Sequence, residues 1–335
     1  MPDDYLRDPD WFIDRIDPSK GCATFVRTDV ERLSKAVFLD GRECFSSGER
    51  FQVPLDRLSP LDETRPVRLI LHMSFCGSTQ LASLIAASGA AIMLREPQAL
   101  VDLADWDRAL RENDTQDSRL APALNAALML LGRQWPDAAP TVIKPSNWAN
   151  NLGPLLRNGN TRGRLVLLTI ERRAFLRAAF RGGRDRLSFN ARASAHFAVA
   201  AGASDLLNNA VKGAADPLDQ AARLTLLAHA LQGRLFDQTS RGPFAEAVRI
   251  DFSRILGDPR QALDQALAGL ALVAPDEAVA TAIERLQLRD SKHPDRTFSA
   301  AGQIIEDAEV ERHHATRFDR ALSWADHALA GMGAT

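Results

Sequence analysis

The pattern of apolar and polar positions divides the chain near residue 190. Before that point, apolar runs of strand length alternate with segments whose apolar residues recur at helical spacing, as Leu81, Leu84 and Ile85 do. This alternation predicts an α/β fold with a parallel sheet covered by helices on both faces. The expected strands are 67–72, 90–94, 141–143 and 164–170, and a further helix is expected at 120–135.

Beyond residue 190 the strand signal almost disappears, and alanine- and leucine-rich segments with helical spacing follow. Asp216 before Pro217 and Asp258 before Pro259 are typical helix starts, because aspartate caps the first N–H groups and proline is tolerated at the first helical position. The apolar stripe of the last helix is expected to dock on the chain's own domain rather than on a partner. The expected elements are one strand at 246–251 and helices at 192–211, 218–238, 259–271, 276–287 and 303–330.

The first 60 residues mix charged positions with short apolar pieces at 23–26 and 36–39. The second piece is followed by Asp40 and Gly41, a pair typical of a turn. This pattern predicts a small β or α+β lead-in at 1–60, followed by a single large α/β domain at 61–335. A chain of 335 residues is long enough for such a core.

A loop of small residues follows the first core strand and precedes a helix. Small residues let the backbone turn tightly, and successive N–H groups at a helix N-terminus form a concave site for phosphate. The loop is not a Walker A sequence, because Ser78 follows Gly77 and no lysine precedes Thr79, which weighs against a kinase or an ATPase. The alternative is a strand-to-helix turn with a serine cap that binds no ligand. The loop residues are Ser74, Phe75, Cys76, Gly77, Ser78, Thr79 and Gln80.

Together, the loop and the alternating pattern predict the fold class: a three-layer parallel sheet of the P-loop nucleotide-binding type with a helical C-terminal half. Two residues beside the loop have alternative interpretations. Cys76 at the helix N-terminus would have a lowered thiol pKa and some reactivity, or would serve only in packing. His72 at the strand end would touch a ligand, or would simply be hydrogen-bonded inside the protein.

Composition and charge narrow the classes of function. The chain has 41 basic and 43 acidic residues, so no overall field draws in nucleic acid or an anionic membrane surface, and any anion site must be local. No apolar run approaches the roughly 20 residues that span a bilayer. Three cysteines without CxxC spacing and the lack of a leader pattern predict a cytoplasmic protein. The seven histidines show no HExxH spacing, so no metal site is expected.

Lysine is rare, and together with abundant alanine this suggests a GC-rich bacterial coding bias. Lys144 stands out because it ends a predicted strand, and open α/β sheets bind ligands at the carboxyl ends of their strands. Glu96 follows Arg95 at the end of another predicted strand. The alternatives are a surface ion pair for Glu96 and an ordinary surface lysine for Lys144.

The segment from Gly77 to Leu81, placed after a strand, resembles the 5′-phosphosulfate-binding loop of the sulfotransferase family, commonly written Arg/Lys-Ser-Gly-Ser/Thr-Thr-x-Leu. The resemblance runs in order over about residues 66–330. It implies that the donor is 3′-phosphoadenylyl sulfate (PAPS) and the product 3′,5′-adenosine bisphosphate. It also implies that Glu96 is the general base, and that Lys144 reaches the bridging oxygen of the donor and offsets charge on the departing phosphate.

The chain departs from the family pattern at three positions. Phe75 stands where the family has a basic residue, and Glu171 and Ala179 stand where the family has the arginine and serine that contact the 3′-phosphate. Nearby arginines could replace these contacts, or could form a solvated helix face. The candidates are Arg172, Arg177, Arg181 and Arg184.

A turn at Ser291 and Lys292, before the last helix, resembles one in bacterial sulfotransferase-like proteins, and Lys292 could reach the nucleotide; a plain polar turn is the alternative. The resemblance therefore implies an enzyme that moves a sulfuryl group to a hydroxyl or amine of a small-molecule or peptide acceptor. A non-catalytic nucleotide-binding or scaffold protein on the same fold is the alternative, and a small-molecule kinase is less favoured. Neither the acceptor nor the oligomeric state can be read from the sequence.

Overall fold

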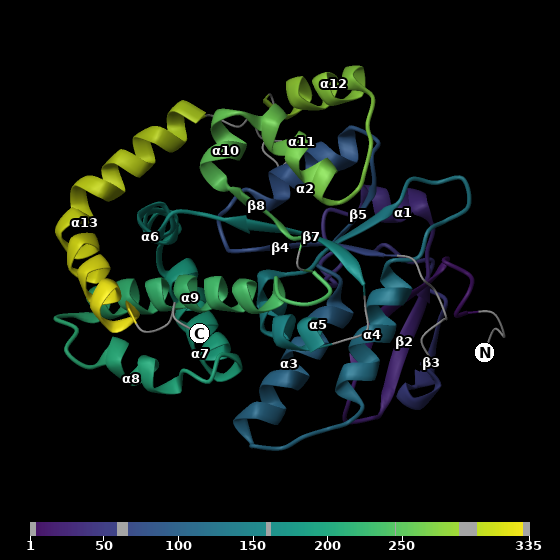
Figure 1. The fold of residues 1–335 in the computed structure, drawn as a ribbon, viewed down its shortest axis with the longest axis horizontal. Helices are drawn as coiled ribbons and strands as arrows, with labels where there is room; N and C mark the ends of the chain where they lie inside the picture. The colour runs from purple at the N-terminus through teal and green to yellow at the C-terminus, as the bar shows by residue number, and fades with distance from the viewer. Residues whose placement is uncertain (1–4, 59–65, 159–161, 245, 288–299, 331–335) are drawn as a thin grey trace.

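A parallel sheet of five strands forms the centre of the fold (Figure 1). The computed structural model describes the chain except for residues 1–4, 59–65, 159–161, 245, 288–299 and 331–335. The four neighbouring strand pairs are all parallel, which confirms the predicted sheet, and the last predicted strand forms one edge. In spatial order the strands are β5 (Ile92–Arg95), β6 (Thr141–Lys144), β4 (Val67–His72), β7 (Gly163–Thr169) and β8 (Val248–Asp251).

Helices cover both faces of this sheet, so the fold has the three layers predicted (Figure 1). One face carries α2 (Ser78–Ala87), α11 (Pro259–Gly269) and α12 (Asp276–Gln287). The other face carries α3 (Gln98–Glu112), α4 (Leu120–Leu131), α5 (Gly153–Asn158) and α9 (Pro217–Thr239). Because both faces are covered, the central strands are nearly continuous apolar runs.

A smaller antiparallel sheet precedes the central one. It consists of β1 (Trp11–Asp17), β2 (Cys22–Arg27) and β3 (Arg50–Pro54), with α1 (Val30–Lys35) between the last two strands and a short 3-10 helix, η1 (Leu55–Arg57), after them. Its buried side chains belong to the same continuous core as those of the parallel sheet. The apolar piece at 23–26 lies within β2, so the lead-in combines strands with a helix, as the α+β alternative expected.

The other apolar piece, at 36–39, is not a strand. Its last residue, Leu39, instead makes single main-chain hydrogen bonds at the end of β5. The Leu39 N–H donates to the Arg95 carbonyl over 2.8 Å, and the Gln98 N–H donates to the Leu39 carbonyl over 3.1 Å. These bonds hold the segment that follows α1 against the carboxyl end of the central sheet.

The C-terminal half is helical, as predicted, but several boundaries differ. The single helix expected at 192–211 is two helices, α7 (Gly183–Ala200) and α8 (Ser204–Val211), because Gly202 adopts φ 62° and ends the first of them. The remaining elements are α6 (Arg172–Arg181), α10 (Phe252–Gly257), α13 (Ala300–Ala328) and the 3-10 helix η2 (Asn147–Leu152).

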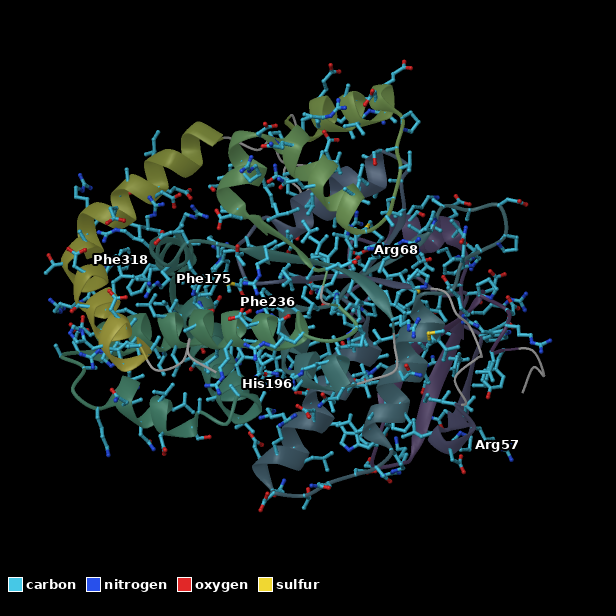
Figure 2. The ribbon with its side chains drawn as sticks, viewed as in Figure 1. Arg57, Arg68, Phe175, His196, Phe236 and Phe318 are labelled. Carbon is cyan, nitrogen blue, oxygen red and sulfur yellow. The ribbon has the colours of Figure 1, made fainter. Side chains whose placement is uncertain are left out.

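Helix α13 crosses α6 and α9 and docks on its own domain, as expected (Figure 1). Phe318 on α13 is fully buried, like Phe175 on α6 and Phe236 on α9 (Figure 2). Ile305, by contrast, is 68% exposed, so the docked stripe begins after it. Within the described ranges of the chain, no helix is both long and apolar enough to cross a membrane.

Candidate functional site

The predicted phosphate-binding loop connects β4 to α2. Phe75 and Gly77 both have left-handed backbone conformations, with φ 63° and 75°, and together they turn the chain sharply from the strand into the helix. A Cβ atom at Gly77 would lie 2.9 Å from the ring of Phe252, so glycine is required here for space as well as for conformation. Gly77 is also the N-cap of α2, and no side chain caps this end, so the alternative of a serine-capped turn is not observed.

A cavity of about 310 Å³ opens in front of this loop. It lies at the carboxyl ends of β4, β5 and β6, where open α/β sheets bind ligands. After β4 the chain continues to β5, on one side of β4, and after β6 it continues to β7, on the other side of β4. The connections from the adjacent strands β4 and β6 therefore run in opposite directions, and the cavity lies at this topological switch point. Its lining residues are Phe38, Arg42, His72, Ser74, Phe75, Ser78, Thr79, Glu96 and Asn147.

Glu96 and Lys144, the two predicted catalytic residues, are paired with each other. The Lys144 Nζ lies 3.0 Å from the Glu96 Oε1, and the Glu96 N–H donates to the Lys144 carbonyl over 2.7 Å. Their backbones meet because Arg95 and Lys144 are register partners of β5 and β6. The Glu96 side chain is 17% exposed and lines the cavity, whereas that of Lys144 is 1% exposed and lies behind it.

Burial lowers the pKa of Lys144, and the charge of Glu96 acts in the opposite direction. The structure therefore brings the two predicted residues together but does not place the ammonium group in the cavity. Glu96 itself has a left-handed backbone, with φ 57°, which is uncommon for a residue with a Cβ and often marks a functional position.

Arg42, which sequence reasoning missed, approaches the same carboxylate from the segment after α1. One of its terminal nitrogens lies 3.3 Å from the Glu96 Oε2, and its Nε donates to both Asp40 carboxylate oxygens. Its guanidinium lies over the Phe38 ring, 4.0 Å from the centroid. No local motif marks this residue, because the contact with Glu96 joins positions 54 apart in the chain.

Another arginine lies beside Phe75, which stands where the resemblance implied a basic residue. The Arg186 guanidinium, from α7, is 5.1 Å from the centroid of the Phe75 ring and donates to the Ala178 carbonyl over 2.9 Å. Burial and the nearby Arg181 lower the pKa of Arg186. A cation therefore lies close to the tip of the loop although the loop itself carries none.

Cys76, within the loop, has a buried side chain, and its Sγ donates to the Met73 carbonyl over 3.0 Å. Loss of solvation raises its thiol pKa to about 12. The prediction that the helix N-terminus would lower this pKa was wrong, because burial outweighs the helix dipole. The packing interpretation describes the residue correctly.

A buried amide network fixes the loop from behind. The Asn147 Nδ2 donates to the Ser74 Oγ over 2.9 Å, and the Asn150 Nδ2 donates to the His72 carbonyl over 3.0 Å. Both amides also reach the Gln232 Oε1 on α9, at 3.4 and 3.1 Å. The His72 ring lies within hydrogen-bonding distance of the Met73 and Pro145 carbonyls, so it is both bonded inside the protein and part of the cavity wall.

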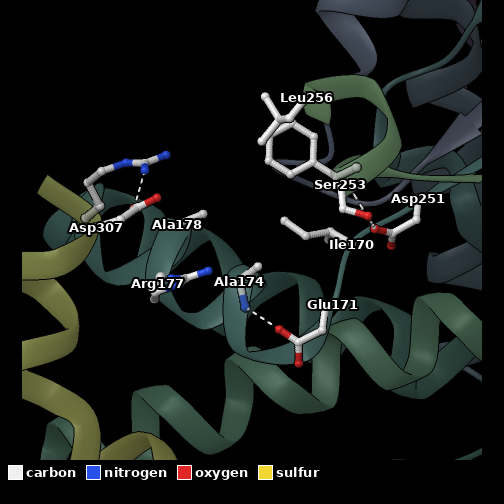
Figure 3. Close-up of a pocket in the computed structure, with 11 residues that line it drawn as sticks. Ile170, Glu171, Ala174, Arg177, Ala178, Asp251, Ser253, Leu256 and Asp307 are labelled. Atoms are coloured by element: carbon white, nitrogen blue, oxygen red, sulfur yellow. Dashed lines mark hydrogen bonds and ion pairs between the residues drawn. The ribbon is translucent and has the colours of Figure 1, made fainter. Parts of the chain in front are cut away.

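The predicted 3′-phosphate residues do not reach this cavity. Arg172 pairs with Asp326 of α13 at 2.7 Å, and the Arg177 Nε lies 3.9 Å from the Glu311 Oε2. Arg177 instead lines a separate cavity of about 170 Å³ between α6, α10 and α13 (Figure 3). Glu171 caps α6 by accepting from the backbone N–H groups of Arg173 and Ala174 (Figure 3).

Arg173 and Arg181 on α6 also pair with carboxylates of α13, so the arginines of α6 form a row of ion pairs between the two helices. Gln80 lies on α2 and does not line the cavity. Lys292 lies outside the described residues. In the parts of the chain that are described, no group of three His, Cys, Asp or Glu side chains could hold a metal ion.

Comparison of the chain with protein-family models and with curated proteins found no match. What the structure itself establishes is an α/β fold with a five-stranded parallel sheet, an antiparallel sheet before it and a helical C-terminal region.

Proposed function

We propose that the chain is a sulfuryl transferase that moves a sulfuryl group from PAPS to a hydroxyl or amine of a small-molecule or peptide acceptor. The observation that carries this proposal is the position of Glu96, whose carboxylate lines the same cavity as the N-terminus of α2. The cavity thus combines a site for an anionic group with a proton acceptor beside it.

The phosphosulfate end of the donor would bind against the loop. The N-terminus of α2 carries a partial positive charge, and three hydroxyl residues, Ser74, Ser78 and Thr79, line the cavity. A cavity of about 310 Å³ falls within the size range of small-ligand sites. It suits the phosphosulfate and an adjoining part of the nucleotide.

In the transfer step, the acceptor oxygen or nitrogen attacks the sulfur atom of the donor. The bond from sulfur to the bridging oxygen breaks, its electron pair remains on the phosphate of the product 3′,5′-adenosine bisphosphate, and Glu96 accepts the acceptor's proton. With the ion pair intact, Lys144 positions the Glu96 carboxylate. Lys144 reaches the departing oxygen only when its ammonium leaves Glu96, and it would then offset the charge that develops there.

Calorimetric titration with 3′,5′-adenosine bisphosphate tests the donor site, and mass-spectrometric detection of sulfated product from PAPS and a panel of phenols, alcohols and amines tests the transfer. We expect binding of the bisphosphate without added metal, and loss of product in Glu96→Gln. Failure of the bisphosphate to bind would overturn the proposal.

A non-catalytic nucleotide-binding protein on the same fold is the second candidate. It is favoured by the ion pairs that occupy Lys144, Arg172 and Arg177, because each would have to open before these residues touched a donor. This candidate predicts bisphosphate binding with no sulfated product from any acceptor. A kinase would instead be stabilised against unfolding by Mg-ATP and not by the bisphosphate.

A further inference from the structure

Arg42 lines the cavity of about 310 Å³ in front of the β4–α2 loop, which we call the loop cavity. Among the described residues that line this cavity, it is the one whose side chain is permanently cationic. Phe75 occupies the loop position where a basic side chain was expected, and Lys144 is buried behind Glu96. Arg42 is therefore the lining residue that offers an anion in this cavity a permanent positive charge.

The setting of Arg42 holds its guanidinium at the mouth of the cavity. The segment that carries it is attached to the sheet through Leu39, whose N–H and carbonyl both bond to the backbone around β5. Asp40 and the Phe38 ring fix the guanidinium from two sides. The side chain nevertheless remains 57% exposed, so a ligand can reach it.

The contact between Arg42 and Glu96 is the weaker of the two carboxylate contacts that Arg42 makes. It is a single contact at 3.3 Å, whereas the Arg42 Nε bonds to Asp40 at 2.8 and 2.6 Å. Half-exposed ion pairs of this kind contribute little stability. Phosphate and sulfate oxygens, by contrast, match the planar arginine fork in two parallel hydrogen bonds. A diphosphate-like ligand can therefore replace Glu96 as a partner of Arg42.

We infer that Arg42 binds the anionic group of the ligand in the loop cavity, and that its transfer from Glu96 to the ligand leaves the Glu96 Oε2 free to accept a proton. The ligand's identity as a phosphosulfate rests on the proposed function; the anion site rests on the cavity and the arginine. Arg42 would thus make up for the missing basic residue of the loop from a different part of the chain.

The test compares Arg42→Met with a matched control, Arg27→Met. Arg27 is also a half-exposed arginine of the N-terminal region, with its guanidinium 5.6 Å from the Trp11 ring centroid and 3.9 Å from a Glu49 carboxylate oxygen. Binding of inorganic pyrophosphate and of 3′,5′-adenosine bisphosphate is measured by calorimetry. Thermal unfolding confirms that each variant is folded.

For Arg42→Met we expect affinity for both probes to fall by between about tenfold and a hundredfold, the range for loss of a hydrogen bond to a charged group. Arg27→Met should leave both affinities within about twofold of wild type. Equal affinities in Arg42→Met and wild type would overturn the inference while leaving the proposed function in place.

The two probes separate this inference from the proposed function. Binding of pyrophosphate that depends on Arg42, with no binding of the adenosine bisphosphate, would support the anion site and overturn the assignment of PAPS as donor. Wild-type protein that binds neither probe would overturn both. A loss of affinity of equal size in Arg27→Met would show a general charge effect and would also overturn the role of Arg42.

Discussion

Lys144 Nζ and Glu96 Oε1 form an ion pair, 3.0 Å apart, in which the two partners differ in their access to solvent. The lysine side chain is 1% exposed and the glutamate side chain 17%. Only the carboxylate faces the cavity, so water can solvate Glu96 but not Lys144. This asymmetry determines how the protein should respond to loss of either partner.

Removing the carboxylate should destabilise the protein more than removing the ammonium. Glu96→Gln leaves the Lys144 ammonium buried without a counter-charge, and we expect the free energy of unfolding to fall by about 3 kcal/mol. Lys144→Met leaves a carboxylate that water and Arg42 can still contact, and should cost about 1 kcal/mol. Urea unfolding at neutral pH measures both.

The double variant Lys144→Met/Glu96→Gln provides the control for this comparison. It contains no buried charge at this position, so it should be more stable than Glu96→Gln alone. If both single variants lost the same stability, the difference in solvent access would not govern the pair.

His196 should make stability depend on pH in the mildly acidic range. Its ring stacks on Trp148 with the centroids 4.0 Å apart and its Nε2 donates to the Trp148 carbonyl over 2.8 Å. Burial lowers the pKa of His196 from 6.5 to about 4. The folded state therefore favours the neutral ring, and the stability gained is present above pH 6.5 and is lost as the pH falls toward 4. This shift corresponds to about 3 kcal/mol.

Urea unfolding between pH 7 and pH 4 checks this expectation. In His196→Gln the stability should fall less steeply with decreasing pH, because glutamine can keep a donor near the Trp148 carbonyl without titrating. The stability of His196→Gln should still depend on pH to some extent, because burial also lowers the pKa of His229. The exposed residue His313 supplies the control, and His313→Gln should follow the wild-type curve. Coincident curves for His196→Gln and wild type would contradict the assignment.

The central sheet was predictable because its strands are buried on both faces and therefore read as apolar runs. Strand β1 was missed because charged Asp14 and Arg15 interrupt its apolar residues, at a place where the pairing with β2 is also irregular. Helix α3 was missed because charged and apolar residues mix along it and no side chain caps its start. The apolar piece at 36–39 forms no strand, and its last residue, Leu39, makes only single main-chain hydrogen bonds at the end of β5.

In the candidate site, only the residues that directly follow strands of the sheet could be placed from the sequence. Glu96 and Lys144 follow neighbouring parallel strands, so their proximity follows from two strand ends. Arg42 and Gln232 could not be predicted, because their contacts with Glu96 and Asn147 span 54 and 85 residues and depend on how separate segments dock. The pairs that Arg172 and Arg177 make with α13 could not be predicted either, because they join segments more than 130 residues apart, as the span of 154 residues between Arg172 and Asp326 shows.

Gly182 should prove necessary for the position of Arg186. A Cβ atom at residue 182 would overlap the Arg186 Cδ, so Gly182→Ala must displace this side chain from Phe75 and from the Ala178 carbonyl. Loss of one cation–π contact and one hydrogen bond should destabilise the protein by about 1 to 2 kcal/mol. Thermal and urea unfolding measure this effect.

Arg186→Ala should have the same effect, and the double variant should be no less stable than either single variant, because both changes remove the same contacts. Gly257→Ala is the matched control, since no atom lies within 4 Å of a Cβ built there. Additive losses in the double variant would mean that Gly182 acts on something other than Arg186.

The loop glycine Gly77 can be tested against Gly89, which has nearly the same backbone conformation. The φ values are 75° and 71°, so alanine should cost about 1 kcal/mol in conformational strain at either position. A Cβ at Gly77 would in addition approach the Phe252 ring to 2.9 Å, whereas nothing lies within 4 Å at Gly89. Gly77→Ala should therefore destabilise by about 2 to 4 kcal/mol, and Gly89→Ala by about 1 kcal/mol.

The same pair of variants links the loop to ligand binding. Gly77→Ala should shift the turn that connects β4 to α2 and weaken the binding of pyrophosphate at least tenfold, because it would displace the helix N-terminus that borders the cavity. Gly89→Ala, at the other end of the same helix, should leave binding unchanged. Adding Phe252→Ala to Gly77→Ala should restore part of the stability by providing space, but not the part lost to backbone strain. Equal binding in both alanine variants would show that the cavity does not use the loop.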